Sequence, residues 1–249
     1  MNPIYIPSRG RATTCSTASH LQDAGIPFHF AVEPQDVESY AVTWGSHRVL
    51  ALPESNRGIA FSRTWIKQYS VSRGELHHWQ IDDNVKTFRK RENKKNVKYS
   101  PAEVLAEAEA VVRRYSNIAI AGLSYTLYAF AAKEPVSINR QAVSCVLVNN
   151  AVSAEWRAGV HEDTDYSMQV LTMGYCTMIF NHLLIEKPPQ MSMKGGHTDV
   201  DYADHGYKTS VGLARMWPGI FEVGLRNGKY RNKPSRVWSR FPQRPKLRE

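Results

Sequence analysis

Two adjacent carboxylates, Asp82 and Asp83, follow an apolar stretch that ends at Ile81, and Asn84 comes directly after them. Because like charges this close repel each other, we expect a cationic group beside them. A hard divalent cation such as Mg²⁺ or Mn²⁺ suits the place, since it takes oxygen ligands and can bridge to a diphosphate. The same residues also fit an Asp-rich turn that caps the following segment.

A second acidic cluster runs from His161 to Asp165 and precedes a segment with a helical pattern. Acidic residues at a helix N-terminus are favoured by the helix dipole, so capping explains part of this cluster. Four ionisable groups in five positions nevertheless exceed what capping needs. An acid here, Glu162 or Asp163, can serve as a general base.

The opening segment places Pro7, Ser8, Arg9, Gly10 and Arg11 between an apolar stretch and a helical one. The planar guanidinium group of arginine suits phosphate, and a helix N-terminus adds backbone N–H donors. The simpler interpretation is a plain loop with solvated arginines.

A late segment, Lys194-Gly195-Gly196-His197, combines a cation, two glycines and an imidazole. Paired glycines let the backbone approach a ligand closely. Lys194 then suits a phosphate and His197 a metal ion, although a single surface histidine usually has no such role.

The elements that must position these residues alternate between strands and helices. Apolar runs and glycine or proline stops predict strands at 4–6, 28–32, 49–52 and 76–81, and helices at 13–24, 35–44 and 59–69. This order predicts an α/β fold with a largely parallel sheet and helices on both faces. Ligands of such sheets bind at the carboxyl ends of the strands, where Ser8, Glu33, Asn56 and Asp82 fall.

The second half begins at Ser100, whose spacing to Glu103 is that of a capping box, with Pro101 as the first helical residue. We expect a helix over 101–115, strands near 118–121 and 143–148 with a possible third between them, a helix over 164–173 and a strand over 176–180. The tail from Lys229 is rich in Pro, Arg and Lys and is predicted to lack regular structure.

The composition excludes several classes of protein. With 249 residues, 42% of them hydrophobic, the chain can build a sizeable core and is not disordered. Three scattered cysteines support neither a disulfide framework nor a thiolate zinc site. The N-terminus lacks a signal-like apolar region, and 118–132 is too short and polar to span a bilayer, so we expect a cytoplasmic protein.

The net charge of +9 is concentrated in two segments. Seven basic residues lie between Lys86 and Lys98, and nine lie between Arg226 and Glu249. Concentrated basic charge predicts a polyanionic partner, although a solvated loop and tail would look the same. Trp238 and Phe241 interleave the tail's arginines and can stack on exposed bases. The candidate DNA contacts are Arg89, Lys90, Arg91, Lys94, Lys95, Arg236 and Arg240.

Taken together, residues 4–198 resemble the GT-A class of nucleotide-sugar glycosyltransferases. Asp82-Asp83-Asn84 is similar to the class's metal and ribose motif, and Glu162-Asp163 to its acceptor-side motif, in which the Asp is the general base. His197 stands where the class often has a metal-ligating histidine. Asn56 and Arg63 match a loop and helix that touch the nucleotide. The motif departs from Asp-x-Asp by ending in Asn84.

More narrowly, the opening Ile-Pro-Ser-Arg-Gly-Arg and the segment Val32-Glu33-Pro34 resemble the TET/JBP-associated glycosyltransferases of bacteriophages. The resemblance implies transfer of a sugar, with inversion, from a UDP-sugar such as UDP-glucose to the hydroxymethyl group of a modified pyrimidine in DNA, 5-hydroxymethylcytosine first. It implies Mg²⁺ or Mn²⁺ on Asp83 and His197, with Asp163 and Glu162 catalytic. The donor would contact Pro7, Ser8, Arg9, Arg11, Glu33, Asn56, Arg63, Asp82 and Lys194.

The same resemblance suggests one GT-A domain over 1–228, with a donor half at 1–99, an acceptor half at 100–228 and a basic tail at 229–249. If the chain is phage-encoded, it would act in the infected host cell. Three alternatives remain open: a metal-dependent DNA nuclease using Asp82, Asp83 and Glu162, a DNA-packaging or architectural protein, and a glycosyltransferase with a saccharide or protein acceptor.

Overall fold

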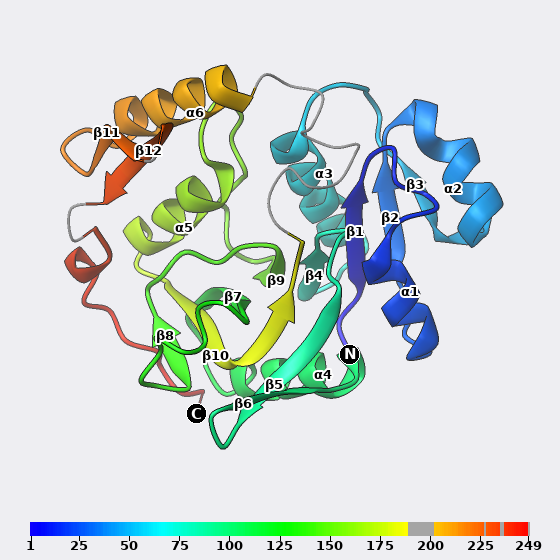
Figure 1. Ribbon diagram of the computed structural model, residues 1–249, viewed down its shortest axis with the longest axis horizontal. Helices are drawn as coiled ribbons and strands as arrows, with labels where there is room; N and C mark the ends of the chain where they lie inside the picture. Colours follow the sequence, from blue (N-terminus) through cyan, green and yellow to red (C-terminus); the bar gives the residue numbers. More distant parts are fainter. Residues whose placement is uncertain (189–201, 227, 235–236, 249) are drawn as a thin grey trace.

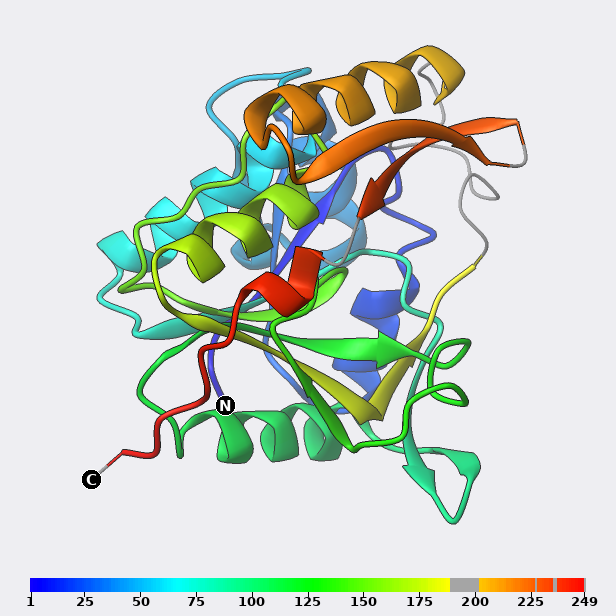
Figure 2. The same ribbon diagram turned by 90° about the vertical axis from the view of Figure 1, so that its left-hand side faces the viewer.

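The computed structural model describes residues 1–188, 202–226, 228–234 and 237–248 (Figure 1). One sheet of ten strands runs through the molecule, and helices cover both of its faces. A separate two-stranded sheet lies beside the last helix (Figure 2). Most strands of the large sheet point the same way, so the expected α/β fold with a largely parallel sheet and helices on both faces is confirmed, and it is Rossmann-like.

The first half of the chain is a regular alternation of strands and helices, as predicted. Strands β3, β2, β1 and β4 are neighbours in that order and all parallel. Short 3₁₀ turns at Pro34–Asp36 and Ser46–Arg48 precede α2 and β3. The elements are β1 (Ile4–Ser8), α1 (Ser16–Asp23), β2 (His29–Val32), α2 (Val37–Trp44), β3 (Val49–Ala51), α3 (Ile59–Ser72) and β4 (His77–Ile81).

The rest of the chain, from residue 87 on, extends the sheet in the order β9, β7, β10, β5 and β6, with most of these pairs antiparallel. The expected third strand is β8, which pairs with β10. The elements are β5 (Thr87–Glu92), β6 (Lys95–Lys98), α4 (Pro101–Val112), β7 (Ile118–Tyr125), β8 (Val136–Ile138), β9 (Cys145–Asn149), α5 (Glu162–Thr172) and β10 (Cys176–Glu186), then α6 (Tyr202–Met216), β11 (Phe221–Arg226) and β12 (Lys229–Pro234).

Burial explains why these segments fold as they do. Every residue of β1 is buried, as expected for a central strand covered on both faces. One apolar cluster joins the sheet to α1, α2 and α4, and others join the opposite face to α3 and α5. The capping box of α4 is confirmed: the Ser100 hydroxyl accepts from the Ala102 amide, and the Glu103 carboxylate accepts from the Ser100 amide.

The basic segment at 86–98 is a β-hairpin and not a loop. β5 and β6 pair in antiparallel register from Arg89 with Lys98 to Glu92 with Lys95. Asn93 and Lys94 turn the chain with positive φ angles of 47° and 66°. Sequence reasoning missed the strands because Phe88 and Val97 are their only apolar residues, which leaves no alternation of apolar and polar positions.

The C-terminal segment also differs from the prediction. Lys229–Pro234 forms β12, and after it Val237 is fully buried while Trp238 and Phe241 pack partly buried against two apolar clusters. The side chain of Asn139 donates to the carbonyls of Phe241 and Gln243, at 2.8 and 2.9 Å. Trp238 and Phe241, which the sequence suggested for stacking on bases, therefore pack against the protein's own apolar clusters.

Cys15, Cys145 and Cys176 are buried free thiols. Among the described residues, no helix combines the length and apolar character needed to cross a membrane.

The packed C-terminal segment makes a prediction about stability. Val237→Ala should lower the free energy of unfolding by about 2 kcal/mol, from roughly 0.8 kcal/mol per buried methylene plus the cavity left behind. For a chain of this size, that corresponds to a loss of roughly 4–8 °C in the unfolding midpoint. Thermal unfolding followed by circular dichroism measures it, with Leu225→Ala, which is 62% exposed on β11, as the control. Equal midpoints for Val237→Ala and the wild type would mean that the segment is not part of the core.

Candidate active site

A buried arginine lies at the centre of the residues that the sequence singled out. Arg63 comes from α3 and is 2% exposed. Its Nη2 donates to Asp82 Oδ1 at 2.8 Å, and its Nε lies 3.8 Å from Asp163 Oδ1. The structure thus brings together the end of β4 and the start of α5, which are far apart in the sequence (Figure 1).

Asp82 is held by two cations. Besides Arg63, Lys187 places its Nζ 2.5 Å from Asp82 Oδ2 and 3.0 Å from Ser144 Oγ. Burial alone would raise the pKa of the Asp82 carboxyl, but Lys187 and Arg63 outweigh it and hold this pKa well below its usual range. Asp82 is therefore an anion at all physiological pH values.

Sequence reasoning missed Lys187. It directly follows β10, the longest strand of the sheet, at the same edge as Asp82. That position at a strand end was the signal that could have found it, since the other polar residues of interest were identified in the same way.

Asp163 has a different environment from Asp82. Its contact with Arg63 is longer than a hydrogen bond, and burial raises the pKa of its carboxyl to about 7, with Glu162 and Asp82 adding to the rise and Arg63 opposing it. Burial also raises the pKa of Glu162. His161 is the N-cap of α5 and makes no capping hydrogen bond through its side chain. Asp163 lies in the first turn of the helix, where a carboxyl of this pKa can accept a proton near neutral pH.

A network of buried polar side chains contacts Arg63 on the side of the core. Arg63 donates to the side-chain oxygen of Gln80 at 3.3 Å, and the Gln80 amide donates back to the Arg63 carbonyl at 3.0 Å. Gln80 also lies 3.0 Å from His78 Nε2, and His78 Nδ1 lies 2.7 Å from Asn150 Oδ1. Burial lowers the pKa of His78 to about 3, so its ring is neutral, with Nδ1 donating and Nε2 accepting.

Asp83 points to the other face of the sheet. Its Oδ2 accepts from Ser8 Oγ at 2.6 Å, and its Oδ1 accepts from Arg11 Nη1 at 2.8 Å. Ser8 also lies 2.6 Å from the hydroxyl of Tyr40. Burial raises the pKa of Asp83 and Arg11 opposes the rise. The chain turns at Asp83 and Asn84, directly after Asp82, so the two adjacent carboxylates meet different partners.

Both carboxylates already have protein partners. Each oxygen of Asp82 and Asp83 accepts from an arginine, a lysine or a serine. Within the described parts of the chain, no group of three or more His, Cys, Asp or Glu residues is placed to hold a metal ion. Lys194 and His197, which the sequence assigned to donor and metal, lie outside the described residues.

The remaining donor candidates form a rim at the ends of β1 and β2. Arg9 lies 3.3 Å from Glu33 Oε2 and donates to Asn56 Oδ1 at 2.8 Å. The Asn56 amide donates to Glu33 Oε1 at 2.9 Å, with a φ of 61° that asparagine tolerates. Pro7 is buried within β1. Arg9 is 41% exposed, so its guanidinium faces solvent and can meet an anionic ligand.

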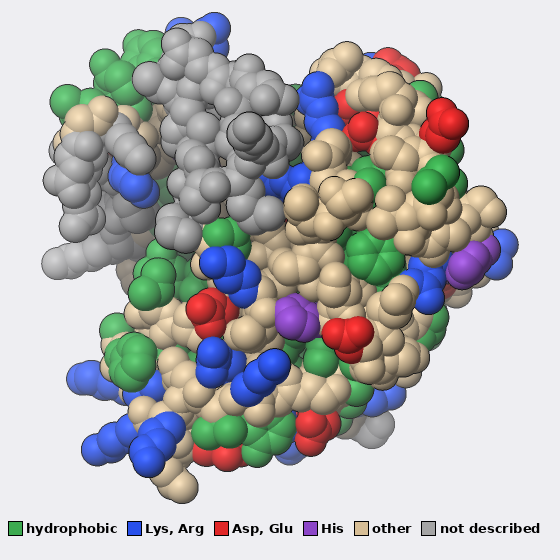
Figure 3. All heavy atoms as spheres, turned by 45° about the vertical axis from the view of Figure 1, so that its right-hand side comes forward, with side chains coloured by type: hydrophobic (Ala, Val, Ile, Leu, Met, Phe, Trp, Pro, Cys, Tyr) green, Lys and Arg blue, Asp and Glu red, His purple; other side chains and the backbone are tan. Residues whose placement is uncertain are grey.

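The basic hairpin lies outside this centre. Arg89 pairs with Glu186 and Lys90 with Glu107, so part of its charge is neutralised within the protein. Lys94 and Lys95 at the turn are exposed. Several Lys and Arg side chains project from the lower left of the molecule in Figure 3, beside hydrophobic ones. Arg240 is exposed, and Arg236 lies outside the described residues.

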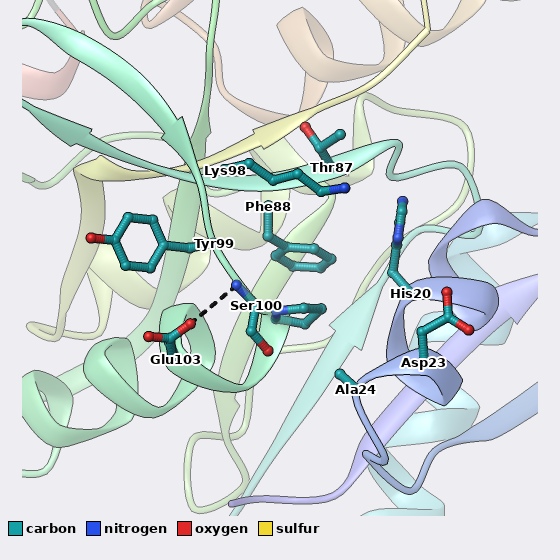
Figure 4. A pocket seen from close by; sticks show the side chains of 10 residues that line it. His20, Asp23, Ala24, Thr87, Phe88, Lys98, Tyr99, Ser100 and Glu103 are labelled. Carbon is teal, nitrogen blue, oxygen red and sulfur yellow. Dashed lines mark hydrogen bonds between the residues drawn. The ribbon is translucent and has the colours of Figure 1, made fainter.

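A separate groove of about 520 Å³ lies between α1, the hairpin and the start of α4 (Figure 4). His20 and Lys98 point into it from opposite sides, over the ring of Phe88. None of its lining residues belongs to the acidic centre or the rim.

Comparison with known proteins identifies the family of this chain. A family model described as TET-Associated Glycosyltransferase matches residues 2–196. No curated protein matches the sequence. A protein from Desulfovibrio desulfuricans G20 described as a nucleotide-diphospho-sugar transferase is 10% identical over 76% of this chain and 80% of its own, with a TM-score of 0.42. The A197 protein from STIV is 11% identical over 74% of this chain and 83% of its own, with a TM-score of 0.43.

The ion pairs of Asp82 make a prediction about stability and pH. Asp82→Asn leaves a buried arginine without its carboxylate and should lower the free energy of unfolding at pH 7 by about 3 kcal/mol. The folded-state pKa of Asp82 is depressed, so its contribution is present above its ordinary pKa of about 3.9 and is lost as the pH falls below it.

Urea unfolding at pH 7 and at pH 3 measures this difference, with Asp23→Asn on the exposed end of α1 as the control. The gap between wild type and Asp82→Asn should narrow at pH 3. A gap that stays constant with pH would mean that the lost stability does not come from the charge of Asp82.

Proposed function

This chain belongs to the TET-associated glycosyltransferase family, and from that premise we propose that it moves a sugar from a UDP-sugar to the hydroxymethyl group of a modified pyrimidine in DNA. UDP-glucose and 5-hydroxymethylcytosine are the first donor and acceptor to test. The observation that carries the proposal is Asp163, a carboxyl with a raised pKa at the start of α5, next to the fixed charges of Arg63 and Asp82. An acid of this kind suits removal of a proton from an acceptor hydroxyl.

In the proposed reaction, Asp163 takes the proton of the hydroxymethyl group while the oxygen attacks the anomeric carbon of the sugar. The bond from that carbon to the diphosphate oxygen breaks as the new glycosidic bond forms. Attack from the face opposite the leaving group inverts the anomeric centre. Glu162 supports the raised pKa of Asp163 by its negative charge.

Cationic side chains are available for the leaving diphosphate. Arg9 lies at the rim with its guanidinium partly in solvent. Lys187 has three N–H donors, of which Asp82 and Ser144 take two, so the third can reach a phosphate oxygen. Donors fixed beforehand at the site of developing charge lower the barrier without reorganising during the reaction. Glu33, Asn56 and Arg63 would position the rest of the donor.

The oxygens of Asp82 and Asp83 already have protein partners, so the proposed reaction does not pass through a metal ion. The ligation of Mg²⁺ or Mn²⁺ by Asp83 and His197 stays a prediction of the resemblance. Transfer measured in EDTA, with and without added Mn²⁺, tests it.

The acceptor assignment draws on charge. The exposed hairpin residues Lys94 and Lys95 suit the phosphate backbone, and the net charge of +9 favours association with a polyanion. We propose that 1–99 binds the donor, that 100–228 binds the acceptor and that 229–249 adds basic charge. Family membership disfavours the nuclease and the architectural protein, and a saccharide or protein acceptor is the remaining alternative. Incubation with radiolabelled UDP-glucose and hydroxymethylated DNA distinguishes a DNA acceptor from a saccharide or protein acceptor. Label on the DNA supports the proposal, and unlabelled DNA contradicts it.

The role of Asp163 makes a kinetic prediction. Asp163→Asn keeps the shape but cannot accept the proton, so turnover should fall by roughly 100- to 10,000-fold while donor binding changes little. In the wild type, kcat/KM should fall as the pH drops below about 7, because protonated Asp163 is inactive. Steady-state kinetics from pH 5 to 9 measure both effects, with Glu155→Gln, an exposed acid, as the control. Normal turnover by Asp163→Asn would exclude it as the base.

The hairpin makes a prediction about salt dependence. If Lys94 and Lys95 each neutralise a phosphate, changing both to alanine should reduce the slope of log affinity against log salt concentration by about 1.8. Fluorescence anisotropy with duplex DNA at several salt concentrations measures the slope. Arg73→Ala, which changes an exposed cation after α3, should leave it unchanged. An unaltered slope in the double variant would place the DNA elsewhere.

A further inference from the structure

A short loop after β7 exposes three large apolar side chains. Leu127 is 83% exposed, Tyr128 64% and Phe130 68%. Two turns shape the loop: the Tyr128 amide donates to the Tyr125 carbonyl at 2.9 Å, and the Ala131 amide donates to the Tyr128 carbonyl at 3.1 Å. Contiguous apolar groups in water are unfavourable and mark a surface that a partner covers.

Positive charge borders this loop. The Arg91 guanidinium lies 4.6 Å from the centroid of the Phe130 ring. Arg91 and Lys133 line one small hollow between the loop and the hairpin together with a single acid, Glu134, so cations outnumber acids there. Figures 1 and 2 both show the β5–β6 hairpin and the segment between β7 and β8 near the same end of the molecule. The partner must therefore offer apolar or aromatic surface together with negative charge.

The loop begins next to the acidic centre. Tyr125, the last residue of β7, lies with its hydroxyl 2.6 Å from Ser144 Oγ. Ser144 accepts from Lys187, which in turn holds Asp82. Three contacts thus connect the first residue of the turn to the charged cluster. From Tyr125, which pairs with Ile185, the loop runs back along β10 to the level of Asn181 and His182. A partner as long as a duplex can therefore cover the loop and reach the charged cluster at the same time.

Nucleic acid meets these requirements better than a protein. Tyr128, Phe130 and Arg91 are of types that occur in protein interfaces as well, but Lys94, Lys95 and Lys133 are not, since lysine is depleted there. DNA supplies both phosphates for the lysines and aromatic bases for the rings. Enzymes that carry out chemistry on a base commonly take it out of the stack into a pocket, and proteins fill or widen the resulting gap with apolar side chains. Aromatic side chains also stack on bases without regard to sequence.

We propose that Leu127, Tyr128 and Phe130 insert into duplex DNA beside the target nucleotide and hold it out of the stack, while Arg91 and the hairpin bind the adjacent phosphates. This inference rests on the proposed function. It adds a loop that opens the duplex and takes no part in the sugar-transfer step.

The experiment compares the wild type with the variant L127A/Y128A/F130A on two acceptors. One is a duplex with a single 5-hydroxymethylcytosine, and the other is the same strand alone. The control variant, V42A/L76A, removes two side chains that are 83% and 78% exposed elsewhere. The loop variant should transfer sugar to the duplex roughly 10- to 100-fold more slowly and to the single strand at nearly the wild-type rate. The fluorescence of a 2-aminopurine placed next to the target should increase when the wild type unstacks the duplex, and should stay unchanged with the loop variant.

Three results would overturn the inference. Equal losses on duplex and single strand would assign the loop to the chemical step or to the fold. An unchanged rate on the duplex would show that the loop does not act there. Binding to phosphatidylserine vesicles that the loop variant loses, with duplex binding unaffected, would identify a membrane surface instead. Failure of the proposed function itself looks different, since the wild type would then label neither acceptor.

Discussion

The centre of this protein depends on a cation that water cannot reach. Arg63 is almost fully buried, and an isolated charge in such a place would be very costly. Asp82 supplies the compensating charge at 2.8 Å, and Asp163 adds a weaker attraction at 3.8 Å. Gln80 and neutral His78 keep the arginine in place from the core side. These contacts fix the positions of α3, β4 and α5 relative to one another.

The same cation gives two carboxyls opposite properties. Asp82 touches Arg63 and Lys187 directly, so it stays ionised and serves as a fixed charge. Asp163 lies farther from Arg63, and burial and two neighbouring acids disfavour its charge, so its pKa rises toward neutrality. Environments that separate the pKa values of neighbouring carboxyls are typical of sites where one acid orients and another exchanges a proton.

The two halves of the large sheet suit different tasks. The parallel strands β1, β2 and β4 end together and present Arg9, Glu33 and Asp82 along one edge. The mixed half, with its long β10, presents Lys187 at the end of that strand and carries the hairpin and the apolar loop farther along it. The C-terminal segment packs against this mixed half: Val237 is fully buried, and the side chain of Asn139 donates to the carbonyl of Phe241. The segment is therefore part of the core and not a free basic tail.

The sequence by itself determined the alternation of the first four strands, the helix start at Ser100 and the polar residues at the strand ends. These features depend on local patterns: apolar runs, glycine and proline stops, and capping chemistry. It could not determine how adjacent acids divide between two faces, because that depends on which helix lies over each face. Asp83 meets Ser8 and Arg11 on one side, and Asp82 meets Arg63 and Lys187 on the other. Only the tertiary structure brought Lys187 to Asp82 across more than a hundred residues, turned the polar segment at 86–98 into a hairpin and buried Val237, because each of these results depends on long-range packing that leaves no periodic signal in the chain.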